Sequence, residues 1–167
     1  MALLNYNKVA KDSMSAIKYK NRREYLDFYA AALDCRFRKK VLRLHVDALV
    51  PVPIHPSRRR TRGFNQAEEL ADRLSDLWNI PVDKKLLIRK KKTAPQRELS
   101  PAERLKNLRE AFFADPDSGR PAGIPETVLL VDDIYTTGST AEACTRALLQ
   151  AGVKRVFVVV ICIGAGR

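Results

Sequence analysis

Two runs of aliphatic residues flank one amphipathic segment near the C-terminal end, and this pattern constrains the fold most. The runs cover residues 127–131 and 155–163, and the segment between them predicts a helix over 139–150 that stops at Gly152. The second run is apolar without alternation, which predicts a strand buried on both faces. A helix between two strands crosses over right-handedly into a parallel sheet. We therefore expect an α/β fold, a mainly parallel sheet with helices on both faces.

The rest of the chain predicts further helices and strands of the same fold. At 167 residues the chain fits one domain, divided into a helical hood (1–46) and an α/β core (47–167). The predicted elements are two amphipathic helices broken near Asn21, a strand over 47–53, a Pro- and Arg-rich loop up to Arg62, a helix over 64–78, a strand over 86–89, a mobile loop over 90–99, a helix over 100–108 and a surface connection over 115–125.

Charge is the unusual part of the composition. Lysine and arginine number 31 against 19 aspartate and glutamate residues, so the formal net charge is +12. Residues 1–62 hold 15 basic and 5 acidic side chains, residues 63–110 hold 11 and 8, and residues 111–167 hold 5 and 6. This excess favours a phosphate-rich partner. Nucleic acid, an anionic membrane and a small phosphorylated substrate all stay open at this point.

Membrane insertion and a protein-built metal cage are not predicted. The longest apolar run, 156–163, is too short to span a bilayer, and the N-terminal residues lack the pattern of a secretory signal. We expect a cytoplasmic location. Cys35, Cys144 and Cys162 are scattered and never spaced as CxxC, so we expect ordinary apolar residues rather than a disulfide framework or a zinc site.

The segment with the clearest chemistry is residues 128–140, VLLVDDIYTTGST. Its aliphatic run ends in Asp132 and Asp133, and a loop of hydroxyl residues and one glycine then opens the next helix. Backbone N–H groups at a helix N-terminus favour a phosphate. Carboxylates at the carboxyl end of a strand pair with sugar hydroxyls. The spacing matches neither a Walker loop nor a dinucleotide fingerprint.

This segment resembles the phosphoribosyl-diphosphate (PRPP) motif of type I phosphoribosyltransferases. The resemblance implies that Asp132 and Asp133 hold the ribose 2- and 3-hydroxyls, with Mg²⁺ held mainly by PRPP near this pair. It implies Asp132, Asp133 and Arg58 as candidate catalytic residues. The loop implied to hold the 5-phosphate consists of Thr136, Thr137, Gly138, Ser139 and Thr140.

Further segments resemble the competence protein F (ComF/GntX) family, from about Ala16 to Ile163. They are VPVPIHPSRRRTRGFNQ at 50–66, TAPQ at 93–96, Leu99 and RLKNLREAF at 104–112. This resemblance implies a role in competence and DNA uptake. Many members begin with a four-cysteine zinc ribbon, and this sequence departs from the family in lacking it.

Breaking the C1–O bond of PRPP requires cations for the leaving diphosphate. In related enzymes the loop after the first core strand binds diphosphate. That loop corresponds to residues 53–62, with Arg58, Arg60 and Arg62 as candidates. The alternative for each arginine is a place on a solvated basic face, without a ligand contact.

Residues 90–99 correspond to the flexible loop that closes over PRPP in the family. The alternative for this segment is a disordered basic loop. Its candidate residues are Arg89, Lys92, Gln96 and Arg104.

The acceptor stays unknown. Relatives that act on hypoxanthine or guanine carry an acidic base where this chain has Thr136, which argues against that chemistry. We expect the acceptor to bind against the hood, with Lys18, Tyr19 and Lys20 as candidates, although core packing is favoured for Tyr19.

Three functions therefore stay open. A homodimer is also possible, because dimers are common in this fold. The first is a phosphoribosyltransferase that uses Mg²⁺-PRPP. The second is a single-stranded DNA-binding accessory of DNA uptake, with Tyr19, Tyr25 and Phe37 as stacking partners. The third is a sensor that binds PRPP without turnover.

Overall fold

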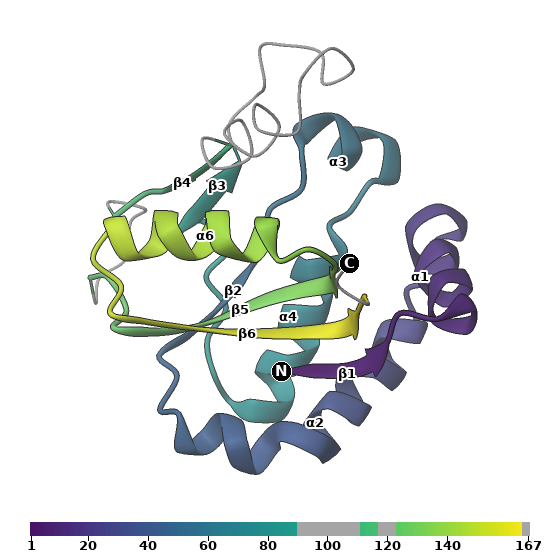
Figure 1. The fold of residues 1–167 in the computed structure, drawn as a ribbon, viewed down its shortest axis with the longest axis horizontal. Coiled ribbons are helices and arrows are strands. Elements are labelled where there is room, and N and C mark those ends of the chain that lie inside the picture. The colour runs from purple at the N-terminus through teal and green to yellow at the C-terminus, as the bar shows by residue number, and fades with distance from the viewer. Residues whose placement is uncertain (90–110, 117–122, 165–167) are drawn as a thin grey trace.

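A four-stranded parallel sheet forms the centre of the protein, as Figure 1 shows for this computed structural model. The structure describes residues 1–89, 111–116 and 123–164. The strand order is β1-β6-β5-β2, and all neighbours in the sheet run parallel. The strands are β1 (Ala2–Asn5), β2 (Ala48–Pro51), β5 (Thr127–Tyr135) and β6 (Arg155–Ile163).

Strand β5 lies in the middle of the sheet and sets the register of its neighbours. Val131 stands opposite Pro51 of β2 and Val159 of β6. The strand extends beyond the predicted end at Val131, because β6 keeps pairing with it as far as Tyr135. Asp132 and Asp133 therefore belong to the last, carboxyl-terminal part of a strand that is buried over residues 127–131.

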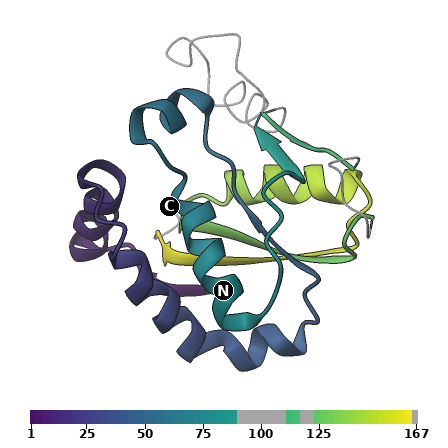
Figure 2. The same cartoon turned by 180° about the vertical axis from the view of Figure 1, so that it is seen from behind.

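Helices cover both faces of the sheet, as expected for an α/β fold. Helix α6 (Ser139–Gln150) crosses over one face in Figure 1, together with a small antiparallel pair, β3 (Leu87–Arg89) and β4 (Phe112–Ala114). Helices α2 (Tyr25–Arg43) and α4 (Gln66–Trp78) cover the other face in Figure 2. Helix α1 (Lys8–Lys20) lies beside the carboxyl edge of the sheet.

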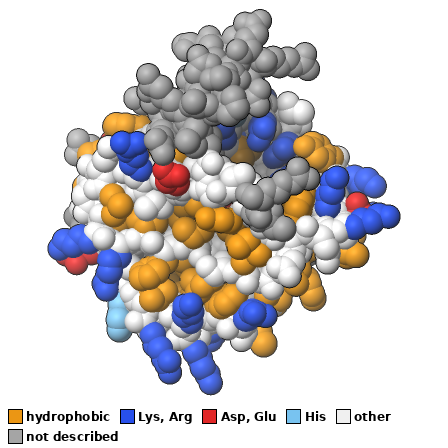
Figure 3. Space-filling view, in the orientation of Figure 1, with side chains coloured by type: hydrophobic (Ala, Val, Ile, Leu, Met, Phe, Trp, Pro, Cys, Tyr) orange, Lys and Arg blue, Asp and Glu red, His pale blue; other side chains and the backbone are white. Residues whose placement is uncertain are grey.

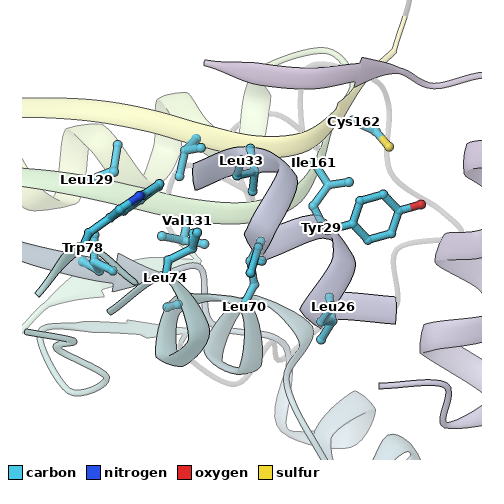
Figure 4. Packing of buried hydrophobic residues seen from close by; sticks show 14 of the residues in the cluster. Leu26, Tyr29, Leu33, Leu70, Leu74, Trp78, Leu129, Val131, Ile161 and Cys162 are labelled. Atoms are coloured by element: carbon cyan, nitrogen blue, oxygen red, sulfur yellow. The ribbon is translucent and has the colours of Figure 1, made fainter. Parts of the chain in front are cut away.

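The larger core packs α2 and α4 against the sheet. Alternate residues of one strand point to opposite faces, so Leu129 and Val131 join this core while Val128 and Leu130 join the core under α6. Figure 4 shows Leu74 and Trp78 of α4 pointing toward the strands. Burial of these side chains is the main force that fixes both helices to the sheet.

Most predicted elements are confirmed. The helix predicted over 139–150 and the strand predicted over 155–163 have those bounds, and the helix over 64–78 starts only at Gln66, after the N-cap Asn65. Asn21, in left-handed conformation with φ 53°, separates α1 from α2 as predicted. The loop over 90–99 and the helix over 100–108 lie outside the described residues.

The segment before Arg62 was expected to be a loop, and this expectation is wrong. It forms α3 (Pro56–Arg62), a short helix with no buried residue. The His55 side chain caps it by accepting from the Ser57 N–H at 3.2 Å, and proline is favoured at the first helical position. Gly63, with φ 78°, ends it in the left-handed conformation.

The structure adds β1 and β4, which the sequence did not predict. β1 pairs with β6 along the edge of the sheet, so residues 1–46 contribute a strand as well as helices, and their boundary with the core stays a prediction. β6 is fully buried only over residues 159–162, because β1 and the helices leave its first half partly exposed. Among the described helices, none is long and apolar enough to cross a membrane.

Core packing of α4 predicts the stability of two matched variants. Leu74 is fully buried on α4, whereas Leu42 on α2 is 50% exposed. We expect Leu74→Ala to lower the free energy of unfolding by about 2–5 kcal/mol through cavity formation. Leu42→Ala is expected to change it by less than about 1 kcal/mol. Urea unfolding measures both, and equal losses would contradict this packing.

Candidate functional site

A cleft of about 280 Å³ opens at the carboxyl ends of β2 and β5. Parallel α/β sheets bind ligands at this edge, where the connections leave the strands. The cleft brings together residues from α1, α3, α4, β3, β5, α6 and the loops between them. Those used below are Lys18, Arg58, Arg62, Asn65, Gln66, Arg89, Asp132, Asp133, Thr136 and Thr140.

The two aspartates are consecutive residues in the last part of β5. Asp133 forms an ion pair with Lys18 of α1, and both side chains are mostly buried. Asp132 accepts a hydrogen bond at its Oδ1 from the Asp133 N–H at 2.8 Å. Burial, and then the neighbouring Asp133 carboxylate, raise the pKa of Asp132 well above its ordinary value. The pair that the sequence singled out is therefore brought together in the cleft.

The hydroxyl-rich loop forms the N-terminus of α6, as predicted. Gly138 is the N-cap with φ 80°, a conformation that favours glycine, and its C=O accepts from the Glu142 N–H at 2.8 Å. The hydroxyls of Thr137 and Ser139 lie 2.9 Å apart, and Thr136 and Thr140 line the cleft. The loop presents backbone N–H groups and hydroxyls at one helix end, which suits a phosphate.

Three guanidinium groups also line the cleft. Arg58 and Arg62 come from α3, and Arg89 comes from the end of β3. Burial, and then the nearby charge of Arg58, lower the pKa of Arg89. Among the described carboxylates, none lies within ion-pair distance of these three arginines. The cleft is therefore electropositive around these arginines.

Other predicted cations are not all in the cleft. Arg60 is exposed on α3 and does not line the cleft, whereas Arg59, between the two lining arginines, pairs with Glu68 at 2.7 Å. Lys92, Gln96 and Arg104 lie outside the described residues. The helical turn of α3 explains this selection, because consecutive side chains point in different directions around a helix.

Of the three hood candidates, only Lys18 lines the cleft. Tyr19 is 72% exposed, so the expected core packing of its ring is wrong. Its ring lies under the Arg62 guanidinium, 5.2 Å from it, and its hydroxyl accepts from Arg62 at 3.4 Å. Tyr19 thus touches a cleft residue from the rim, and Lys20 is exposed beyond it.

Asn65 and Gln66 line the cleft and were not proposed as site residues from the sequence. Both are buried, at 1% and 3% exposure. Asn65 caps α4 by accepting from the Ala67 N–H, and it donates to the Val52 C=O at 3.0 Å. The available signal for both was the Arg-Gly-Phe-Asn-Gln block at 62–66, which is part of a segment that resembles the competence protein F family.

Among the residues that line the cleft, Asp132 and Asp133 supply the carboxylate oxygens for a hard cation. Within residues 1–89, 111–116 and 123–164, no three His, Cys, Asp or Glu side chains gather as a metal site. Two carboxylates beside a hydroxyl-rich loop suit Mg²⁺ when most of its ligands come from a bound phosphorylated molecule.

Comparisons with known proteins agree with this geometry. Residues 59–167 match the family described as the phosphoribosyl transferase domain. Competence protein F of Haemophilus influenzae is 38% identical over 113 residues, which are 67% of this chain and 48% of that protein. Competence protein ComFC of Bacillus subtilis is 32% identical over 154 residues, 90% of this chain and 58% of that protein. The chain spans about half the length of the curated relatives it matches.

One solved structure shows the same fold. Glutamine phosphoribosylpyrophosphate amidotransferase from B. subtilis, complexed with ADP and GMP, superposes with a TM-score of 0.50 at 19% identity. The match covers 83% of this chain and 25% of that chain. The expected phosphoribosyltransferase fold is confirmed.

The raised pKa of Asp132 predicts a gain in stability when its charge is removed. The folded protein binds the proton of the Asp132 carboxyl group more tightly than the unfolded chain does. The free energy of unfolding therefore falls as the pH rises above the ordinary pKa of 3.8. We expect Asp132→Asn to raise the thermal midpoint by a few degrees at pH 7 and to leave it unchanged below pH 3.8. Asp76→Asn, on the exposed surface of α4, is the control. A lower midpoint for Asp132→Asn at pH 7 would contradict the raised pKa of Asp132.

Proposed function

The chain belongs to the phosphoribosyl transferase domain family, on its competence protein F branch, and from this membership we propose that it binds Mg²⁺-PRPP and transfers the phosphoribosyl group. The observation that carries the proposal is the cleft itself. Its walls supply a helix end with hydroxyls at Thr136–Thr140, a carboxylate pair and three arginines. These groups suit the 5-phosphate, the ribose and the diphosphate of PRPP.

The residues of the cleft have separate tasks in this reaction. The C1–O bond to diphosphate breaks, a nucleophilic atom of the acceptor bonds to C1, and the proton that this atom loses passes to solvent. Arg58, Arg62 and Arg89 neutralise the charge that develops on the leaving diphosphate. Asp132 and Asp133 accept hydrogen bonds from the ribose hydroxyls and orient the sugar.

A bound Mg²⁺ would be held by ligand oxygens beside Asp132 and Asp133, where it would supply positive charge to the phosphate oxygens.

The Lys18–Asp133 ion pair has a consequence for ligand entry. Because a carboxylate accepts several hydrogen bonds, a ribose hydroxyl can bind Asp133 beside the Lys18 ammonium group or displace it. Lys18 belongs to α1, in the hood against which the acceptor is expected to bind.

The names of the relatives, competence protein F and ComFC, support a role in competence and DNA uptake. The acceptor is not specified by these names. It has to fit the rim between α1 and α3, where Tyr19 and Arg62 stack on each other. A planar acceptor could replace one partner in this stack.

Titration calorimetry tests PRPP binding. We expect the unmodified chain to bind PRPP in the presence of Mg²⁺, and the double variant Asp132→Asn, Asp133→Asn to lose this binding, because both acceptors for the ribose hydroxyls lose their charge. Asp76→Asn is expected to bind PRPP normally. Unchanged affinity of the double variant would refute the site assignment.

Release of diphosphate then separates a transferase from a sensor. The chain is incubated with Mg²⁺-PRPP and a panel of nucleobases, and diphosphate is assayed against time. Release that depends on one base identifies the acceptor. PRPP binding without release for any base favours the sensor.

A second candidate function, binding of single-stranded DNA, is favoured by the exposed surface of α1 and α2. Tyr19, Tyr25 and Phe28 are 72%, 41% and 68% exposed, and aromatic rings on such a surface can stack on bases. Figure 3 shows lysines and arginines gathered over α1 and α2. Phe37 is less suitable than expected from the sequence, because it is half-buried against the core.

Fluorescence anisotropy with an oligothymidine tests this second function. We expect the affinity to fall steeply as salt rises, and Tyr19→Ala to weaken it by about five-fold or more, as the loss of one stacked base does. Phe113→Ala, on β4 and 45% exposed, is the control. Affinity that is independent of salt would exclude binding through the DNA backbone.

A further inference from the structure

The buried side chain of Gln66 has an unused hydrogen-bond donor. Gln66 is the first residue of α4, it is 3% exposed, and it lines the cleft. Its Nε2 atom is buried and has no hydrogen-bond partner within the part of the chain that the structure describes. A buried amide that donates to nothing destabilises the folded state, so its presence in a cleft wall points to a missing acceptor.

The neighbouring polar side chains at the start of α4 have hydrogen-bond or ion-pair partners of their own. Asn65 caps the helix and also bonds the C=O of Val52. In the first turn, Glu68 pairs with Arg59 at 2.7 Å and Glu69 with Arg73 at 2.9 Å. Both carboxylates are therefore neutralised by arginines. Gln66 alone among these four first-turn and cap side chains has a buried donor left over.

The surroundings of Gln66 favour an anionic acceptor. The arginines that share the cleft, Arg58, Arg62 and Arg89, carry only hydrogen-bond donors, so none of them can accept from the amide. Gln66 stands at the N-terminus of a 13-residue helix, where the helix dipole attracts negative charge. An amide donor, a helix N-terminus and three guanidinium groups in one cleft match a ligand with several anionic oxygens.

We propose that the side-chain amide of Gln66 donates a hydrogen bond to a diphosphate oxygen of the bound ligand, making the N-terminus of α4 a second anion subsite. The proposal rests on the proposed function, because the diphosphate is that of PRPP. α4 follows β2 after the short α3, the α6 loop follows β5, and β2 and β5 are neighbours in the sheet. The two helix N-termini thus serve the two ends of one substrate, the 5-phosphate at α6 and the diphosphate at α4.

Calorimetry with three probes tests this subsite in the full chain: Mg²⁺-diphosphate, PRPP and ribose 5-phosphate. Gln66→Met keeps the length of the side chain and removes the donor. We expect it to weaken diphosphate and PRPP by about ten-fold, the loss of one hydrogen bond to a charged group, and to leave ribose 5-phosphate within about two-fold. Its thermal midpoint should equal or exceed that of the unmodified chain, because an unpaired buried donor is removed.

A second variant keeps the test decisive if Gln66→Met folds poorly. Gln66→Glu has nearly the same shape, but it replaces the donor with a carboxylate that repels diphosphate, so we expect a larger loss for diphosphate than for ribose 5-phosphate. Equal affinities for diphosphate in all three proteins would overturn the inference, as would a parallel loss of all three ligands with a lowered midpoint. Binding of neither PRPP nor ribose 5-phosphate by the unmodified chain would instead overturn the proposed function.

Discussion

The pairing of β5 between β2 and β6 is the constraint on which the rest of the structure depends. Both faces of β5 are buried over residues 127–131, so a shift of its register by one residue would turn every core side chain to the wrong face. That register places Asp132 and Asp133 at the carboxyl edge, next to the end of β2 and the start of α6. The packing of the core therefore positions the chemistry of the cleft.

The same cleft concentrates groups that destabilise the folded protein. Asp132 and Asp133 repel each other, Arg58 and Arg89 do likewise, and Gln66 has a buried donor without an acceptor. Lys18 offsets one of these costs by pairing with Asp133. Unfavourable groups gathered at one place are a mark of functional sites, because a ligand that carries the complementary charges and acceptors satisfies them together.

The sequence predicted the elements that carry strong hydrophobic patterns, and with them the positions of the aspartate pair and of the hydroxyl-rich loop at the start of α6. It did not predict β1, whose four residues become a strand only by pairing with β6. It missed α3 because a Pro-Ser-Arg segment has no apolar face, and its caps, His55 and Gly63, decide the conformation. The exposure of Tyr19 and the unpaired amide of Gln66 depend on contacts between distant elements, which local patterns do not contain.

The central claim is that one cleft binds the whole of PRPP between two helix N-termini. A crystal structure of the chain with Mg²⁺ and PRPP tests it most directly. The account predicts the 5-phosphate on the loop at Thr136–Thr140, the ribose hydroxyls on Asp132 and Asp133, and the diphosphate beside Arg58 and the start of α4. A ligand bound elsewhere, or a phosphoribosyl group that leaves both aspartates uncontacted, would contradict it.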